Sequence, residues 1–351
     1  MWHRGPPSAV ATDLPDPVLS THRRAVLMRA IVQERFGPPE TLQLVDAEKP
    51  EIGSGDVLLE VHAAAVNPYD WHVLRGDPRI ARLMGVGVTR PKARIAGVDV
   101  AGRVEDVGAD VRGLRRGDEV FGFCRGAFAE YATADAALVV PKPAGLSFEQ
   151  AAAMPMAAVT ALHAIRDRGR VQAGHRVLVN GAAGGVGTFA VQIAAALGTE
   201  VTGVCSARNV DLVRSIGAAH VVDYASKDFV DGPVRFDLIL DNVGNRTIRD
   251  LRRTVTPTGM VIVNGGGSPG HVIGAVGSIL RAAVVNLFVR QQITFVPTTQ
   301  SRDDLLAVAE LVEAGTLRPV IDRTYQLVDT AAGLRYVEAG HAGGKVVITV
   351  T

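Results

Sequence analysis

The sequence predicts an α/β fold with two domains, one rich in β-strands and one built on a doubly wound parallel sheet. The chain has 351 residues, a length typical of two domains. Residues 28–143 consist of short strand patterns separated by glycine turns. From about residue 147, short apolar runs alternate with helical stretches, as in βαβ units with right-handed crossovers.

The composition is that of a globular protein with two ordinary hydrophobic cores. Hydrophobic residues make up 47% of the chain and charged residues 21%. Lys and Arg number 37 against 36 Asp and Glu, and this balance argues against a nucleic-acid partner. The two cysteines, Cys124 and Cys205, are too few for a disulfide framework or a four-thiolate zinc site.

Two segments lie outside this pattern. Residues 1–27 contain four prolines and no apolar run of signal-peptide length, so we expect a disordered tail, with Met28 as an alternative start. The apolar stretch 271–289 is interrupted by Arg281, Asn286 and glycines. We therefore expect a buried or interface segment there rather than a membrane span, and a cytoplasmic protein.

The first domain is expected to be a curled sheet without a long helix. Val57, Leu59 and Val61 alternate with residues that include Glu60 and His62, which indicates a half-buried strand. Further strands are predicted over 96–107 and 119–123, the second after the turn signal at 117–118.

The second domain alternates between strands and helices. A helical stretch over 148–166 is interrupted by Pro155. Strands are then predicted over 177–180, 200–205, 220–223, 236–241 and 260–263, with helices over 186–197, 209–216 and 246–255. An amphipathic helix over 302–313 and a strand over 346–350 are expected to rejoin the first domain.

A glycine-rich turn is the strongest single motif. The apolar strand that ends at Asn180 runs through Gly181, Gly184 and Gly187 directly into a helix. Glycines at a strand–helix junction allow a tight turn and close approach of a pyrophosphate, which the helix N-terminus then binds. The spacing is G-x-x-G-x-x-G, and its strand–turn–helix context predicts a dinucleotide site; the alternative is a turn used only for packing.

The end of the next strand favours NADPH over NADH. An NAD site usually places an acidic residue there, yet no Asp or Glu lies between Val201 and Val210. Ser206 and Arg208 offer instead a hydroxyl and a guanidinium, which suit the 2′-phosphate of NADPH. Arg208 as a merely solvated charge is the alternative.

These motifs, taken in order, resemble the medium-chain dehydrogenase/reductase superfamily, in particular its zinc-independent quinone oxidoreductase-like branch. The resemblance covers residues 28–351 and rests on the segments 65–70, 97–108, 117–122, 156–163, 181–187 and 241–244. It implies a GroES-like catalytic domain (28–150 and 290–351) interrupted by a Rossmann NADPH-binding domain (151–289). It also implies a homodimer.

The zinc-dependent relatives are the alternative that the sequence disfavours. Their catalytic zinc takes a Cys where this chain has Asn67 and a His-Glu pair where it has Val98 and Asp99. A Val cannot bind a metal and an amide is a poor zinc ligand, so we expect no metal.

Hydride transfer without a Lewis acid favours an acceptor that is already electrophilic, such as a quinone or an α,β-unsaturated carbonyl. The developing oxyanion needs hydrogen-bond donors, for which we expect Asn67 first and Tyr69 second. For the neighbours Asp70, Trp71 and His72 we expect a helix or turn cap, a packing residue and a structural histidine.

Further cofactor contacts come from the resemblance and from the position of residues at strand ends. Asn242 follows a predicted strand of the parallel sheet, at the edge where ligands bind, and Gly265 follows the next. The full expected set is Thr160, Ala183, Gly184, Gly185, Val186, Gly187, Ser206, Arg208, Tyr224, Asn242, Gly265, Phe295, Val296 and Lys345.

Two other functions stay open at this stage. The chain could bind NADPH without catalysing a reaction, as a sensor or regulatory protein, because a fold does not determine a function. A membrane-peripheral reductase of lipid-soluble quinones would rest only on the apolar stretch 271–289.

Overall fold

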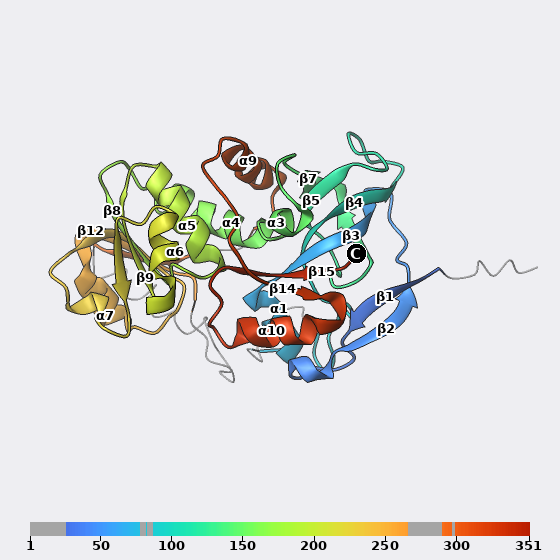
Figure 1. Cartoon of the computed structure of the whole chain (residues 1–351), viewed down its shortest axis with the longest axis horizontal. Helices are drawn as coiled ribbons and strands as arrows, with labels where there is room; N and C mark the ends of the chain where they lie inside the picture. Colours follow the sequence, from blue (N-terminus) through green and yellow to red (C-terminus); the bar gives the residue numbers. More distant parts are fainter. Residues whose placement is uncertain (1–25, 78–81, 83–86, 266–289, 297–298) are drawn as a thin grey trace, which may run out of the picture.

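Two large sheets stand side by side in the computed structural model, each with helices packed against it (Figure 1). The structure describes residues 26–77, 82, 87–265, 290–296 and 299–351. The first sheet belongs to the β-rich domain and the second to the parallel-sheet domain, and helices α3 (Phe148–Ala152) and α4 (Pro155–Leu162) lie between them (Figure 1). The predicted fold class is confirmed.

The β-rich domain contains a seven-stranded sheet centred on the long strand β3 (Asp56–Val66). The strand order is β14-β15-β3-β4-β5-β7, and β6 pairs with the first half of β3. These strands are β4 (Asp99–Val107), β5 (Glu119–Phe123), β6 (Tyr131–Asp135), β7 (Val139–Pro141), β14 (Ile321–Gln326) and β15 (Lys345–Thr349). Strands β1 (Leu27–Val32) and β2 (Gln43–Glu48) form a separate antiparallel pair.

The β-rich domain also contains two short helices. Helix α1 (Pro68–Arg75) begins immediately after β3, and α10 (Thr330–Glu338) packs beside β14 and β15. The signal for α1 in the sequence is weak because the helix is only eight residues long and starts with Pro68. Its C-terminus is marked by Gly76 in the left-handed conformation, with φ +59°.

The second sheet has six parallel strands in the order β10-β9-β8-β11-β12-β13. Numbered along the chain this is 3-2-1-4-5-6, the doubly wound dinucleotide-binding order. Its strands are β8 (Arg176–Asn180), β9 (Glu200–Cys205), β10 (His220–Asp223), β11 (Phe236–Asp241), β12 (Val255–Val263) and β13 (Gln292–Phe295). Its helices are α5 (Gly185–Ala196), α6 (Val210–Ser215) and α7 (Ile248–Thr254).

The expected boundary at residues 289/290 needs correction. Strand β13 pairs with β12, so residues 292–295 belong to the six-stranded sheet and the chain rejoins the first domain after them. Likewise the expected tail ends before Leu27, which already lies in β1. Most of the tail and the stretch 271–289 lie outside the described residues. Within the described part, no helix is long and apolar enough to cross a membrane.

Helix α9 (Arg302–Glu313) joins the two domains, as its position after the parallel sheet suggests. Its residues Leu305 and Val308 are fully buried in a core that also contains residues of both sheets. Arg302 donates to the carbonyl of Val139 in β7 at 2.6 Å. The helix therefore connects the edge of the first sheet with α4.

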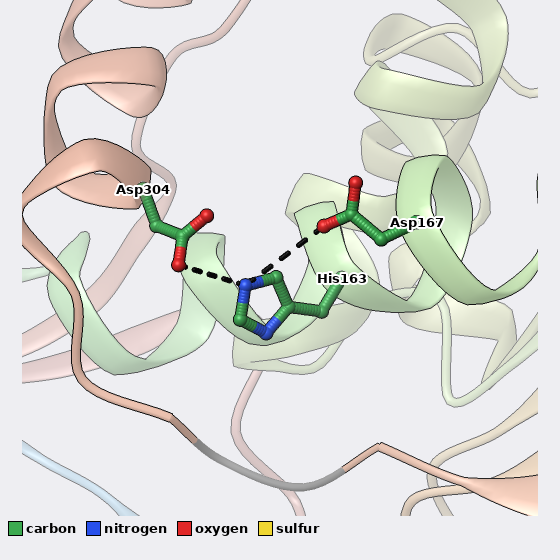
Figure 2. A group of neighbouring side chains, drawn as sticks. All are labelled: His163, Asp167 and Asp304. Atoms are coloured by element: carbon green, nitrogen blue, oxygen red, sulfur yellow. Dashed lines mark ion pairs between the residues drawn. The ribbon is translucent and has the colours of Figure 1, made fainter.

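A polar network fastens α9 to the π-helix η4 (His163–Arg168) that continues α4 (Figure 2). His163 Nε2 lies 2.9 Å from Asp304 Oδ2 and 3.9 Å from Asp167 Oδ2. Arg166 contacts both carboxylates, at 2.6 Å from Asp167 Oδ1 and 3.6 Å from Asp304 Oδ1. Since the Arg166 guanidinium already contacts both carboxylates and His163 bonds to Asp304, we read this network as a polar contact that holds α9 against η4.

The remaining short helical turns connect these elements. They are η1 (Pro39–Thr41), η3 (Ala136–Leu138), η5 (Ala207–Asn209), η6 (Phe229–Asp231) and η7 (Leu327–Asp329).

Candidate active site at the junction of the two sheets

The strand order of the parallel sheet reverses between β8 and β11, and the polar residues collect there. Asn180, the last residue of β8, is the register partner of Asp241, the last residue of β11. Crevices at such a switch point are where open α/β sheets bind ligands. Because all six strands are parallel, their carboxyl ends share one edge, here called the cofactor edge. It brings together the glycine turn, Ser206, Tyr224, Asn242, Gly265 and Phe295.

The glycine turn has the geometry that its spacing predicts. Gly181 adopts φ +77°, a conformation that disfavours any side chain. A Cβ on Gly187 would lie 2.1 Å from the Gly181 carbonyl oxygen, so this glycine lets α5 pack directly on the turn. Gly184 caps the helix, and Gly185 and Val186 open it. Ala183 is buried within the turn.

Two buried polar atoms at the cofactor edge have no protein partner among the described residues. Asp241 accepts three hydrogen bonds through Oδ1, yet its Oδ2 is buried and unpaired. Asn242 accepts from Asn264 through Oδ1, while its Nδ2 is unpaired. Leaving such groups unsatisfied costs about 1–3 kcal/mol each, which a bound ligand would relieve. A Cβ on Gly265 would lie 1.9 Å from the Asn242 carbonyl oxygen, so this residue must be glycine. The residues at this edge therefore fit a dinucleotide.

The residues expected at the adenosine end follow β9 and β10. Ser206 accepts a hydrogen bond from Asn209 at 3.3 Å, and Tyr224 is 54% exposed beyond the end of β10. Arg208 is exposed, and its Nη2 donates to the carbonyl of His341 in the loop before β15. This guanidinium thus also ties the two domains together, and its other donors have no partner among the described residues.

The end of β3 and the start of β15 form a second polar centre, inside the protein. Lys345 Nζ donates to Asn67 Oδ1 at 2.5 Å and lies 3.5 Å from Asp99 Oδ2. Asn67 Nδ2 donates to Asp99 Oδ2 at 2.9 Å, and Asp99 Oδ1 accepts from the backbone N–H of Met156 at the start of α4. We call Asn67, Asp99 and Lys345, with the neighbouring Asp70, the buried cluster.

All four members of the buried cluster are almost inaccessible to solvent, at 3% exposure or less. Burial lowers the pKa of Lys345, and the charges of Asp99 and Asp70 oppose that shift. Burial likewise raises the pKa of Asp99, against the effect of Lys345. Two carboxyls share one ammonium, and burial raises the pKa of Asp70 to about 7, with the nearby charge of Asp99 acting in the same direction.

The aliphatic part of Lys345 links this cluster to the cofactor edge. A Cβ on Gly185 would come within 2.9 Å of Lys345 Cδ, so the lysine crosses the first residue of α5. Thr160, one helical turn into α4, is buried and donates to the Met156 carbonyl at 2.7 Å. Phe295 is 42% exposed at the end of β13, and Val296 beside it is buried.

The structure changes the ranking of the two expected catalytic residues. Asn67 Nδ2 donates to Asp99 and its other hydrogen faces the Ala65 carbonyl at 3.5 Å, so the amide has no N–H left for a substrate. Tyr69 is half exposed, and burial, together with the charge of Asp70, raises the pKa of its hydroxyl. Tyr69 is therefore the better candidate donor.

Asp70, Trp71 and His72 have the structural roles that their residue types predict. Asp70 accepts the backbone N–H of Asn67 at 2.7 Å, as in a capping box. Trp71 is buried in the core of the β-rich domain and stacks on His72, whose Nδ1 lies 3.0 Å from the Asp77 carbonyl oxygen. These three side chains hold α1 in place.

Sequence reasoning missed Asp99 and Asp241 as site residues. Asp241 ends the predicted strand 236–241 and Asp99 lies within the predicted strand 96–107, and neither position alone distinguishes a site residue from a structural Asp. Only the packing of β3, β4 and β15 shows that Asp99 is matched by a lysine nearly 250 positions later.

Comparisons with known proteins agree with this geometry. Residues 53–144 match the family model for the alcohol dehydrogenase GroES-like domain, and residues 216–348 match one described as a zinc-binding dehydrogenase. The mouse (Mus musculus) mitochondrial NAD(P)H oxidoreductase RTN4IP1 is 32% identical over 97% of this chain and 94% of its own length. The chain belongs to the medium-chain dehydrogenase/reductase superfamily, in its zinc-independent quinone oxidoreductase-like branch.

Two further relatives support this assignment. The tomato (Solanum lycopersicum) 2-methylene-furan-3-one reductase is 31% identical over 92% of this chain and 79% of its own length. The solved structure of the quinone oxidoreductase from Coxiella burnetii superposes with a TM-score of 0.81 at 30% identity, covering 93% of this chain and all of that one. The predicted family is confirmed.

The zinc named in one family description does not fit the residues present here. The three ligand positions of the zinc-dependent branch hold Asn67, Val98 and Asp99. Val98 has no donor atom for a metal, and the Lys345 ammonium contacts the other two side chains. A fixed positive charge in the place of a cation opposes metal binding. Cys124 and Cys205 are both buried, and burial raises the pKa of the Cys205 thiol to about 11, away from the thiolate form that binds zinc.

We predict that Lys345→Met destabilises the protein by about 3–5 kcal/mol, because it leaves Asp99 buried without its ammonium partner. The double variant Lys345→Met/Asp99→Asn should lose less than the sum of the two single variants. In the double variant the Asn67 amide can turn and accept from the amide introduced at position 99. Urea denaturation of the unmodified protein, the two single variants and the double variant measures the coupling energy between Lys345 and Asp99. If the losses in the free energy of unfolding were additive, the two residues would not form a buried pair.

We predict that Asp70 makes stability fall as the pH rises. Its folded pKa of about 7 lies above the ordinary value of 3.8, so folding takes up a proton between these two pH values. This contribution to the free energy of unfolding is fully present below about pH 4 and is lost as the pH passes 7.

Asp70→Asn cannot ionise, so its stability relative to the unmodified protein should increase steadily from about pH 5 to about pH 8. Urea denaturation at several pH values measures this difference. Asp46→Asn, at a position on β2, is the control and should give parallel curves. Parallel curves for Asp70→Asn as well would contradict the raised pKa.

Proposed function

We propose that the protein is an NADPH-dependent reductase that transfers hydride to a quinone or an α,β-unsaturated carbonyl without a metal. The observation that carries this proposal is the buried cluster, in which the Lys345 ammonium takes the position of a catalytic cation beside the cofactor turn. This ammonium is held by three acceptors from the protein, the Asn67 amide, the Asp99 carboxylate and the Val66 carbonyl. It organises the site and does not polarise a substrate directly.

The cofactor edge supplies the groups that would hold NADPH. The turn at 181–187 and the N-terminus of α5 suit its pyrophosphate, Ser206 and Arg208 its 2′-phosphate, and Asn242 with Gly265 the half nearer the nicotinamide. NADPH, when bound, supplies the hydride. The relatives' names, which refer to NAD(P)H, support this cofactor.

The substrate class follows from the residues of the site, which suit no Lewis acid that could polarise the substrate carbonyl. An unactivated ketone gains most from polarisation by a Lewis acid, whereas a quinone or enone accepts hydride readily without one. The names of the Coxiella and tomato relatives concern a quinone and an exocyclic enone. Tyr69, whose hydroxyl is protonated at neutral pH and whose pKa is raised further by burial, would donate to the oxygen that gains negative charge.

Three further properties belong to the proposal. We expect a homodimer formed through β13, the edge strand of the parallel sheet, where Phe295 is exposed. We place the protein in the cytoplasm, although the mouse relative is mitochondrial by name. We divide the chain into a catalytic domain of residues 28–150 and about 297–351 and a cofactor domain between them.

We predict that the protein oxidises NADPH in the presence of 1,4-benzoquinone, 9,10-phenanthrenequinone or a short enone, and not with a simple aldehyde. Tyr69→Phe should lower kcat about 100-fold and leave the Kd of NADPH unchanged, because the hydroxyl acts on the substrate oxygen. Tyr131→Phe, on β6, is the matched control and should keep full activity. Tight NADPH binding without turnover of any acceptor would instead support a sensor.

We predict that Arg208→Gln raises the KM of NADPH about 10- to 100-fold and leaves the KM of NADH unchanged, because a charged hydrogen bond to phosphate contributes about 1.5–3 kcal/mol. Arg214→Gln, on α6, is the control. Equal effects on both cofactors would mean that Arg208 serves only to hold the His341 loop.

A further inference from the structure

Four arginines surround one open cavity on the parallel-sheet domain, at the edge opposite to the cofactor edge. The cavity has a volume of about 550 Å³ and is lined by Arg235, Arg252, Arg253, Val255, Pro257, Arg290 and Gln291. These residues precede β11, end α7, begin β12 and precede β13. They lie at the amino ends of the strands, on the order of 15 Å from Asp241, because a strand rises about 3.3 Å per residue.

Most of this positive charge has no acidic counterpart among the residues that the structure describes. Arg253 alone among the four forms an ion pair in the described part of the chain, with Asp250 Oδ1 at 2.6 Å. Arg252 donates from Nε to the neutral Gln291 side chain at 3.0 Å, and Arg235 donates to the backbone carbonyls of Gly232 and Val234. Each guanidinium has five donors, and within the described residues most of these donors have no partner.

The segment directly before Arg290 cannot supply the missing acids, and Asp237, two positions after Arg235, accepts instead from the Arg176 backbone N–H and the Thr256 hydroxyl. Residues 266–289, which directly precede Arg290, contain no Asp or Glu and one further arginine, Arg281. The chain as a whole carries a net charge of only +1, so this concentration is local. Helix α7 ends with Arg252 and Arg253, where cations stabilise the helix dipole, but that effect does not account for Arg235 and Arg290.

The cavity is also structured rather than a set of independent surface side chains. Gln291 accepts from Arg252 Nε and donates back to the Arg252 carbonyl at 2.9 Å and the Thr256 carbonyl at 3.3 Å. This exchange fixes the Arg252 side chain against the strand ends. Val255 and Pro257 are the apolar residues of its lining.

We propose that this cavity binds a small anion that carries two or more neighbouring phosphate groups, at a site separate from the cofactor. Arginine matches phosphate oxygens through paired N–H donors, and several guanidiniums around one space repel each other until such an anion is bound. The ligand is either a free oligophosphate or the headgroup of a phosphoinositide, which share this chemistry.

The test is an isothermal titration calorimetry experiment in which tripolyphosphate is added to the NADPH-saturated protein. Saturation with NADPH excludes binding of the probe at the cofactor edge. Arg235→Gln/Arg290→Gln should weaken binding at least about tenfold, because each guanidinium makes charged hydrogen bonds to phosphate. The control is the double variant Arg112→Gln/Arg35→Gln, which changes the net charge by the same amount. Arg112 donates to backbone carbonyls, as Arg235 does, and Arg35 is exposed, as Arg290 is. The control should bind as tightly as the unmodified protein.

A second arm uses phosphatidylcholine vesicles with and without a phosphoinositide bisphosphate, in a sedimentation assay. If the protein binds tripolyphosphate and only the Arg235→Gln/Arg290→Gln variant loses this binding, the ligand is a free oligophosphate. Binding to phosphoinositide vesicles alone, again lost only in that variant, supports the headgroup. Equal losses in both variants, no binding in either arm, or binding that disappears when NADPH is saturating would overturn the proposal. Unchanged NADPH affinity in both variants shows that they are folded.

Discussion

The interaction on which the site depends is the contact of one buried ammonium with one amide and one carboxylate. Lys345 on β15, Asn67 at the end of β3 and Asp99 at the start of β4 come from three neighbouring strands of one sheet. An unpaired charge at this depth would be very unfavourable, so the three strands must hold their register for the charges to meet. Through Met156 and Gly185 the same cluster contacts the starts of α4 and α5. It thereby couples the catalytic sheet to the cofactor turn.

That coupling accounts for the chemistry that the protein can perform. In a zinc-dependent relative the corresponding positions would hold a Lewis acid; here they hold an internal cation whose donors are used by the protein. The site can then orient a cofactor and offer a hydrogen-bond donor, and the acceptor itself must be electrophilic. Asp241 and Asn242, whose side chains each keep one buried atom without a partner among the described residues, lie beside the glycine turn at the strand-order reversal. Both halves of the site therefore lie where the two sheets meet.

Much of this could be predicted from the sequence because its signals are local. The strand, glycine turn and helix over 177–197 are contiguous, and the apolar alternation of β3 is visible within eleven residues. The helix predicted over 302–313 has those bounds in the structure. The cluster could not be predicted, because Lys345 and Asp99 meet only through the pairing of β15 and β4 on opposite sides of β3. For the same reason Asn67 looks like a free donor in the sequence, although its amide nitrogen and oxygen both bond to protein groups. The boundary before β13 was misplaced because a four-residue strand after an apolar stretch shows little periodicity.

The most direct test of the central claim is the rate of NADPH oxidation with 1,4-benzoquinone, measured on protein treated with a strong chelator and then supplied with Zn²⁺. If Lys345 replaces the metal, the rate is the same before chelation, after chelation and after zinc is added. A rate that is lost on chelation and restored by zinc would contradict the account, because it would require a metal where the structure has an ammonium.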